Sequence, residues 1–109
     1  MKGVTAMIKT IEAILNLKES EGLTIKNYQS IHYKTGWQVA DHGVECKTAE
    51  EAVRAVASYK GNCGVWYSEG TYYIDHSFRV KTKKEALTIG RKYNQISILK
   101  WATMSLVYC

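Results

Sequence analysis

The chain has 109 residues, 46% of them hydrophobic and 23% charged, with 15 Lys and Arg residues against 10 Asp and Glu residues. This length suits one domain, and this composition excludes a disordered chain, which lacks the apolar surface that offsets the entropy of ordering. The net charge of +5 favours anionic partners such as phosphates, nucleotides or nucleic acid. No apolar run approaches the roughly 20 residues of a membrane span, and the first residues lack a signal-peptide core, so we expect a soluble protein.

The cysteines and histidines are scattered along the chain. Cys46, Cys63 and Cys109 form no Cys-x-x-Cys pair, and the three histidines add no zinc-ligand spacing. We therefore expect reduced thiols, no metal site and no cofactor.

The first predicted element is an amphipathic helix that is closed near Gly22. Its apolar stripe follows helical spacing and consists of Met7, Ile8, Ile11, Ile14 and Leu15.

An internal repeat follows, in which residues 28–61 align with residues 62–95 without a gap. Nine of the 34 positions are identical, against about two expected from ordinary residue frequencies. The identical pairs are Tyr33/Tyr67, Gly36/Gly70, Asp41/Asp75, His42/His76, Lys47/Lys81, Thr48/Thr82, Glu51/Glu85, Ala52/Ala86 and Tyr59/Tyr93. We interpret the repeat as a duplicated ββα unit.

Each copy begins with a predicted hairpin. In the first copy the extended segments 29–33 and 37–40 flank a turn that ends in Gly36, and in the second copy 63–67 and 71–74 do the same. Aromatic and β-branched runs around a short glycine turn are typical of hairpins.

Each copy then continues with a Lys-Thr-x-x-Glu-Ala motif. Thr48 and Thr82 are placed as N-caps, and the glutamate three residues later completes a capping box. The motif and the apolar spacing predict helices over 48–59 and 82–93.

Two more strands are predicted at 96–101 and 105–108. The expected fold is a two-layer α+β domain over residues 1–109, with a mainly antiparallel sheet of about six strands. Its order is an N-terminal helix followed by ββα-ββα-ββ. The second face of this sheet lacks a predicted cover, and part of the strand aromatic set would be exposed on it: Tyr33, Trp37, Trp66, Tyr67, Tyr72, Tyr73, Trp101 and Tyr108. An exposed aromatic surface marks a partner site, so we expect a homodimer or a higher homo-oligomer.

Two Asp-His pairs, Asp41-His42 and Asp75-His76, invite an acid–base interpretation. Neighbours in a strand point to opposite faces, which disfavours a carboxylate that orients its adjacent imidazole. We interpret both pairs as polar ends of strands. Because no nucleophile or phosphate-loop signature accompanies them, we do not expect an enzyme.

The second copy departs from the first where its helix ends. It has Arg91, Lys92, Asn94 and Gln95 where the first copy has Ala57, Ser58, Lys60 and Gly61. These cations and amides suit a nucleotide edge, but they also suit a helix C-terminus with Asn94 as a left-handed cap. Both interpretations stay open.

A tyrosine-led strand segment at 73–77, Tyr-Ile-Asp-His-Ser, precedes a helix that ends in Asn94-Gln95 before the next strand. With this motif, residues 62–101 resemble the Thoeris anti-defence protein 1 family of small phage-encoded proteins. The resemblance implies an antiparallel sheet with helices, assembly into dimers or larger oligomers, and no catalysis. It also implies that the protein acts in the host cytoplasm, where it holds a cyclic ADP-ribose isomer made by a TIR-domain sensor and thereby keeps the NADase effector silent. Some members also bind cyclic oligonucleotides.

The resemblance and the adjoining strand ends suggest ten ligand-binding residues. Arginine would meet phosphate, amides a base or ribose edge, and an aromatic ring a base. The candidates are Arg79, Arg91, Asn94, Gln95, Phe78, Trp66, Trp37, Lys100, Trp101 and Met104.

The alternative is a phage inhibitor of the anti-CRISPR or anti-restriction type that binds nucleic acid or a host defence protein. A basic chain with sheet aromatics suits single-strand binding. Against it, the charge excess is modest and the basic residues form no continuous stripe, so we expect neither nucleic acid nor a membrane as partner. An inert structural or assembly protein of a phage is the third interpretation.

Overall fold

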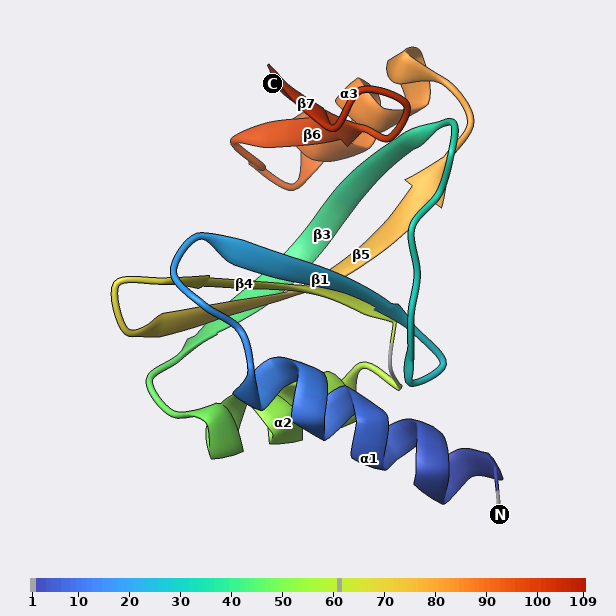
Figure 1. Ribbon diagram of the computed structural model, residues 1–109. Helices are drawn as coiled ribbons and strands as arrows, with labels where there is room; N and C mark the ends of the chain where they lie inside the picture. The colour runs from blue at the N-terminus through green and yellow to red at the C-terminus, as the bar shows by residue number, and fades with distance from the viewer. Residues whose placement is uncertain (1, 61) are drawn as a thin grey trace. The chain divides into compact units, whose positions relative to one another are not determined.

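The computed structural model describes residues 2–60 and 62–109 and shows an α+β fold with three helices and seven strands (Figure 1). The predicted fold class is confirmed. The helices are α1 (Lys2–Leu15), α2 (Ala49–Ser58) and α3 (Lys83–Lys92). The strands are β1 (Glu21–Lys26), β2 (Gln29–Ser30), β3 (Trp37–Cys46), β4 (Cys63–Ser68), β5 (Thr71–Val80), β6 (Ser97–Lys100) and β7 (Ser105–Tyr108).

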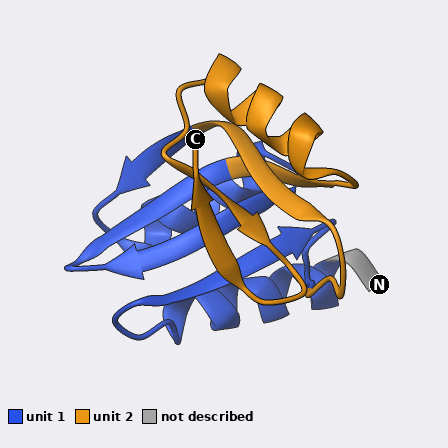
Figure 2. Cartoon of the chain, turned by 90° about the horizontal axis from the view of Figure 1, so that it is seen from above, with its two compact units in different colours: residues 1–31, 43–75 blue, residues 32–42, 76–109 orange. Residues whose placement is uncertain are grey.

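The strands form one sheet in the order β2-β1-β4-β5-β3-β6-β7. By its contacts the chain divides into two compact units, residues 1–31 with 43–75 and residues 32–42 with 76–109 (Figure 2). The units do not coincide with the copies of the repeat. Helix α2 of the first copy groups with the start of the second copy, and α3 groups with residues 32–42 of the first.

In the first unit, α1 and α2 lie on the same side of β1 and β4 (Figure 1). Alternation along the strands sends Leu23 and Ile25 of β1 toward these helices, and a buried cluster forms between the layers. This cluster consists of Ile14, Ile25, Cys46, Ala52, Val56, Cys63, Val65, Tyr72 and Ile74.

The second unit has its own smaller core, in which α3 packs against β6. Val39, Ala86 and Ile98 are buried there. Gly90 of α3 lets Cys109 approach closely, because a Cβ at position 90 would lie 2.6 Å from the Cys109 sulfur.

The duplication is visible in the second strand and the helix of each copy. The bounds of β3 and β5 differ by the same 34 residues as those of α2 and α3. Both N-caps are confirmed, because Thr48 and Thr82 accept hydrogen bonds from the backbone N–H of Glu51 and Glu85 at 3.1 and 3.2 Å.

The predicted hairpin of the first copy is wrong. Segment 29–33 shortens to β2 at Gln29–Ser30, which pairs with β1 rather than with β3. Strand β1 was not predicted, because its partner turn lacks the usual glycine signal. Asn27 and Tyr28 adopt φ values of 51° and 61° there, as a two-residue hairpin of the primed type requires.

The N-terminal helix is confirmed, but its predicted end near Gly22 is wrong, because Gly22 lies in β1. Helix α1 ends at Leu15, and the side chains of Met7, Ile8 and Leu15 are 41%, 49% and 58% exposed. Its buried residues are Thr10 and Ile14. Thr10 takes an inward position because its single hydroxyl hydrogen lies between two backbone carbonyl acceptors, that of Tyr28 at 2.8 Å and that of Ala6 at 3.0 Å.

The strand aromatics divide between core and surface. Tyr72 and Trp101 are buried, whereas Trp66, Tyr73 and Tyr108 are exposed. None of the described helices is long and apolar enough to cross a membrane.

All three cysteines are free thiols. Burial, with a smaller contribution from the Asp75 charge, raises the pKa of Cys63 to about 12. Burial, followed by the charge of Glu51, also raises the pKa of Cys46. Both thiols therefore stay protonated at neutral pH and behave as apolar core residues.

Candidate functional site

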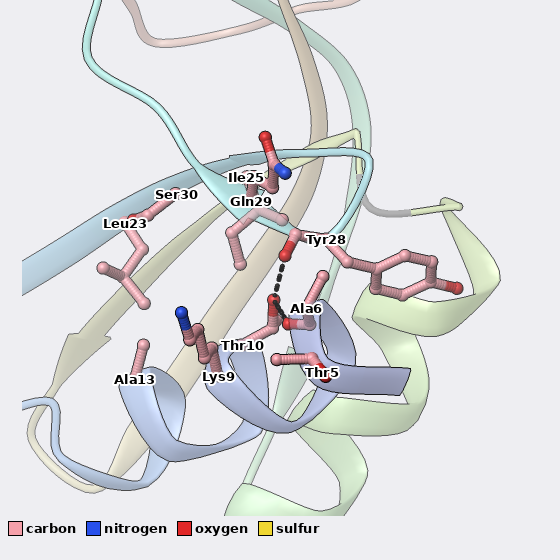
Figure 3. Close-up of a pocket in the computed structure, with 10 residues that line it drawn as sticks. All are labelled: Thr5, Ala6, Lys9, Thr10, Ala13, Leu23, Ile25, Tyr28, Gln29 and Ser30. Carbon is pink, nitrogen blue, oxygen red and sulfur yellow. Dashed lines mark hydrogen bonds between the residues drawn. The ribbon is translucent and has the colours of Figure 1, made fainter. Parts of the chain in front are cut away.

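A cavity of about 610 Å³ lies in the first unit, between α1 and the β1–β2 hairpin (Figure 3). This volume is within the range of small-molecule sites, roughly 300–1,000 Å³. The lining residues are Thr5, Ala6, Lys9, Thr10, Ala13, Leu23, Ile25, Tyr28, Gln29 and Ser30.

The cavity combines an apolar wall with polar groups. Leu23 and Ile25 point from β1 toward α1, and the amino group of Lys9 reaches from α1 toward the strands (Figure 3). The helix adds the Thr5 and Thr10 hydroxyls, and β2 adds the Gln29 amide. Hydroxyls and amides suit sugar and base edges, and an ammonium suits phosphate.

Of the ten residues predicted to bind a ligand, none is among the described residues that line this cavity. Trp66 belongs to the first unit and the other nine belong to the second. Sequence reasoning missed the cavity because it is formed by β1 and β2, and β1 had not been recognised.

Arg79 is engaged with the loop before β3. Its guanidinium donates to the Thr35 carbonyl at 2.7 Å and to the Thr35 hydroxyl at 3.0 Å, and it lies 5.5 Å from the centre of the Tyr33 ring. Gly36 has a φ of +89°, and a Cβ there would meet the Arg79 Nε at 2.6 Å. Arg79 therefore holds this loop in place.

Arg91, Asn94 and Gln95 lie at the C-terminal end of α3. Asn94 adopts a φ of 55°, its N–H donates to the Arg91 carbonyl, and the N–H of Gln95 donates to the Gly90 carbonyl at 2.8 Å. This is the hydrogen-bond pattern of a Schellman cap. Arg91 Nε donates to the carbonyl of Cys109 at 3.4 Å.

The remaining candidates differ in accessibility. Trp101 is 2% exposed, and Phe78 and Trp37 are half-buried against the second core. Lys100 places its ammonium 5.8 Å from the centre of the Trp37 ring. Met104 and Trp66 are exposed at 52% and 46%.

The cap geometry allows a stability test at Asn94. Asn94→Ala is expected to lower the free energy of unfolding by about 1 kcal/mol, because alanine tolerates the left-handed conformation poorly. Asn94→Gly should leave stability within about 0.5 kcal/mol of the original, since glycine adopts that conformation freely. Urea denaturation followed by circular dichroism measures both. Equal losses in the two variants would mean that the side chain, and not the backbone conformation, carries the stabilisation.

The second unit also brings together Asp41, His42 and His76. One carboxylate oxygen of Asp41 lies 2.6 Å from Nδ1 of His42 and 2.9 Å from Nδ1 of His76. Burial raises the pKa of Asp41, but the hydrogen bonds and charges of His76 and His42 more than offset this, and the net pKa lies below the ordinary 3.8. The expectation that Asp-His pairs end their strands is wrong, because both pairs lie in the middle of β3 and β5.

Comparisons of the chain with protein-family models, with curated proteins and with solved structures find no match.

Proposed function

We propose that this protein binds and retains a small anionic nucleotide of the cyclic ADP-ribose class without converting it. In the host cytoplasm it would thereby keep the signal from a Thoeris effector. The observation that supports this most is the cavity between α1 and the β1–β2 hairpin, whose volume and lining chemistry suit a ligand of that kind. The net charge of +5 and the resemblance of residues 62–101 also support it.

The groups at the cavity match the parts of such a ligand. A cyclic ADP-ribose contains a pyrophosphate, two riboses and an adenine, which need a cation, hydroxyl or amide partners and an apolar or aromatic surface. Lys9, Gln29 and the Leu23–Ile25 wall offer these three. Retaining a scarce signal needs about nanomolar affinity, roughly −12 kcal/mol, which requires that the ligand be largely enclosed.

Calorimetric titration with cyclic ADP-ribose isomers tests this function. We expect one isomer or more to bind tightly and to be recovered intact. Lys9→Gln should weaken binding about ten- to hundredfold, because it removes a charge-assisted hydrogen bond of about 1.5–3 kcal/mol. Lys83→Gln, an equal loss of charge at an exposed position of α3, is the control.

Two other outcomes would contradict the proposed function or the proposed site. Failure of every isomer to bind at micromolar protein would overturn the proposed function. If Arg91→Ala abolishes binding and Lys9→Gln does not, the ligand binds at the end of α3 and the cavity is not its site.

The homo-oligomer expected from the sequence belongs to this proposal, because assembly would help to enclose a ligand. Exposed apolar residues at helical spacing on α1, including Val4, Ile8 and Leu15, are consistent with burial against a second copy. Light scattering at micromolar concentration should therefore give a multiple of 12.4 kDa. A 12.4 kDa species at all concentrations would contradict this prediction.

A second candidate function, binding of single-stranded nucleic acid, is favoured by one pair of residues. Trp66 and Tyr73 face each other across β4 and β5 and are 46% and 39% exposed. The Trp66 ring also covers Gly22 of β1, where a Cβ would meet it at 2.9 Å. Such an aromatic surface can stack bases. Binding of an oligonucleotide that weakens steeply with salt and is lost in Trp66→Ala would support this candidate.

A further inference from the structure

Asp41, His42 and His76 form a compact group of ligand atoms within the second unit. Two come from adjacent positions of β3 and the third from β5. One ligand atom from each residue lies within 4.8 Å of the other two. The His42 and His76 rings are nearly parallel, with centroids 5.2 Å apart and an interplanar angle of 22°. Both present Nδ1 to the same carboxylate oxygen.

We propose that Asp41, His42 and His76 bind a divalent first-row transition-metal ion such as Zn²⁺, through two imidazole nitrogens and one carboxylate oxygen. Imidazole suits Zn²⁺, Ni²⁺, Cu²⁺ and Fe²⁺, and two imidazoles with one carboxylate are a common set in sites that keep an open coordination position. This site involves neither the cavity nor the residues proposed to hold a nucleotide.

The distances suit such an ion after small side-chain movements. Metal–ligand bonds of about 2.0–2.2 Å in a tetrahedral site place neighbouring ligand atoms roughly 3.3 Å apart. The separations from Asp41 Oδ1 to the two Nδ1 atoms, 2.6 and 2.9 Å, are slightly shorter than this. An ion would therefore enter by separating three groups that already converge.

Exposure gives the ion a route in and leaves room for further ligands. The His42 side chain is 61% exposed, whereas those of His76 and Asp41 are 32% and 23% exposed. Two ligands are thus held by their surroundings and the third can rotate onto the ion. Water or an exogenous anion would complete the coordination on the solvent side.

The repeat explains how two distant histidines come to share one carboxylate. His42 and His76 occupy equivalent positions of the two copies, 34 residues apart, and β3 and β5 are neighbours in the sheet. The equivalent positions therefore meet at the middle of the two strands. The third histidine, His32, stands outside this group with its ring 5.1 Å from that of Trp101, and it provides a matched control.

Titration of the tag-free, reduced chain with ZnCl₂ by calorimetry at pH 7.5, in a buffer without phosphate, tests the proposal. We expect one ion per chain, and binding weakened about tenfold or more in each of Asp41→Asn, His42→Gln and His76→Gln. His32→Gln should bind as the original does. Circular dichroism checks that the variants fold. His42→Gln alters the most exposed of the three ligands, so this variant still tests the proposal if Asp41→Asn or His76→Gln fails to fold.

The absorption spectrum of the Co²⁺-loaded protein distinguishes this site from a site on the thiols. Cys109 is the most accessible of the three cysteines, and a thiolate ligand would produce an intense near-ultraviolet charge-transfer band that Cys109→Ser removes. We expect only the weak visible bands of nitrogen and oxygen ligation. The proposal is overturned if no ion binds at millimolar concentration, which would leave a purely hydrogen-bonded cluster, or if binding is lost with His32 or Cys109.

Discussion

Replacing Ile74 by alanine is expected to lower the free energy of unfolding by about 2–5 kcal/mol, a large part of the 5–15 kcal/mol typical of a whole domain. Ile74 is 1% exposed and belongs to the core that α1 and α2 build with β1, β4 and β5. The substitution removes three buried carbons and leaves a cavity that close-packed neighbours fill only in part.

Urea denaturation followed by circular dichroism measures this loss as a lower midpoint with an unchanged slope. Ile96→Ala is the matched control, since Ile96 is 80% exposed and its truncation should change stability by no more than about 0.5 kcal/mol. Similar losses in the two variants would contradict the assignment of Ile74 to the core.

Trp101→Ala should lower the free energy of unfolding by about 3–5 kcal/mol, and Trp101→Phe by about 1–3 kcal/mol. Trp101 is 2% exposed, and its indole N–H donates to the Gln38 side-chain oxygen at 3.0 Å. The Gln38 amide in turn donates to the buried Ser77 hydroxyl at 3.1 Å. Phenylalanine would keep much of the packing but would leave the Gln38 oxygen without its donor.

The same variants separate a structural role of Trp101 from the ligand role suggested by its sequence position. In thermal unfolding, the melting temperature of Trp101→Ala should be lower than that of Trp101→Phe, and both should be lower than that of Trp66→Phe. Trp66→Phe alters an exposed ring and serves as the control. A Trp101→Phe protein of unchanged stability that no longer binds the nucleotide would contradict the structural role.

Several features of the fold follow from the sequence alone, because interactions between residues close in the chain determine them. The Thr48 and Thr82 caps bond to an N–H three residues away, and the helices begin where these caps predict. The strands at Trp37 and Thr71 begin directly after Gly36 and Gly70, whose positive φ values only glycine adopts easily. Each of these signals occurs at equivalent positions of both copies of the repeat.

Features that depend on tertiary contacts were not predictable in the same way. Helical periodicity identifies the apolar face of α1 but not what covers it, so the exposure of Met7, Ile8 and Leu15 could not be predicted. The buried position of Thr10 depends on a hydrogen bond to the Tyr28 carbonyl, 18 residues away in the chain. The β1–β2 hairpin lacks a glycine signal, so the cavity that it forms with α1 could not be anticipated.

The cluster of Asp41, His42 and His76 shows the same division. Each residue was visible in the repeat, and alternation along a strand argued against any contact within a pair. The placement of β3 beside β5, in strands that continue through these residues, brings His76 to the Asp41 carboxylate. His42 reaches the same oxygen from the adjacent position, so the expectation of no contact within a pair is wrong for Asp41-His42. The helix caps and the glycine turns are thus determined by the local sequence, whereas the meeting of His42 with His76, 34 positions apart, is decided by strand pairing, which depends on the packing of the whole sheet.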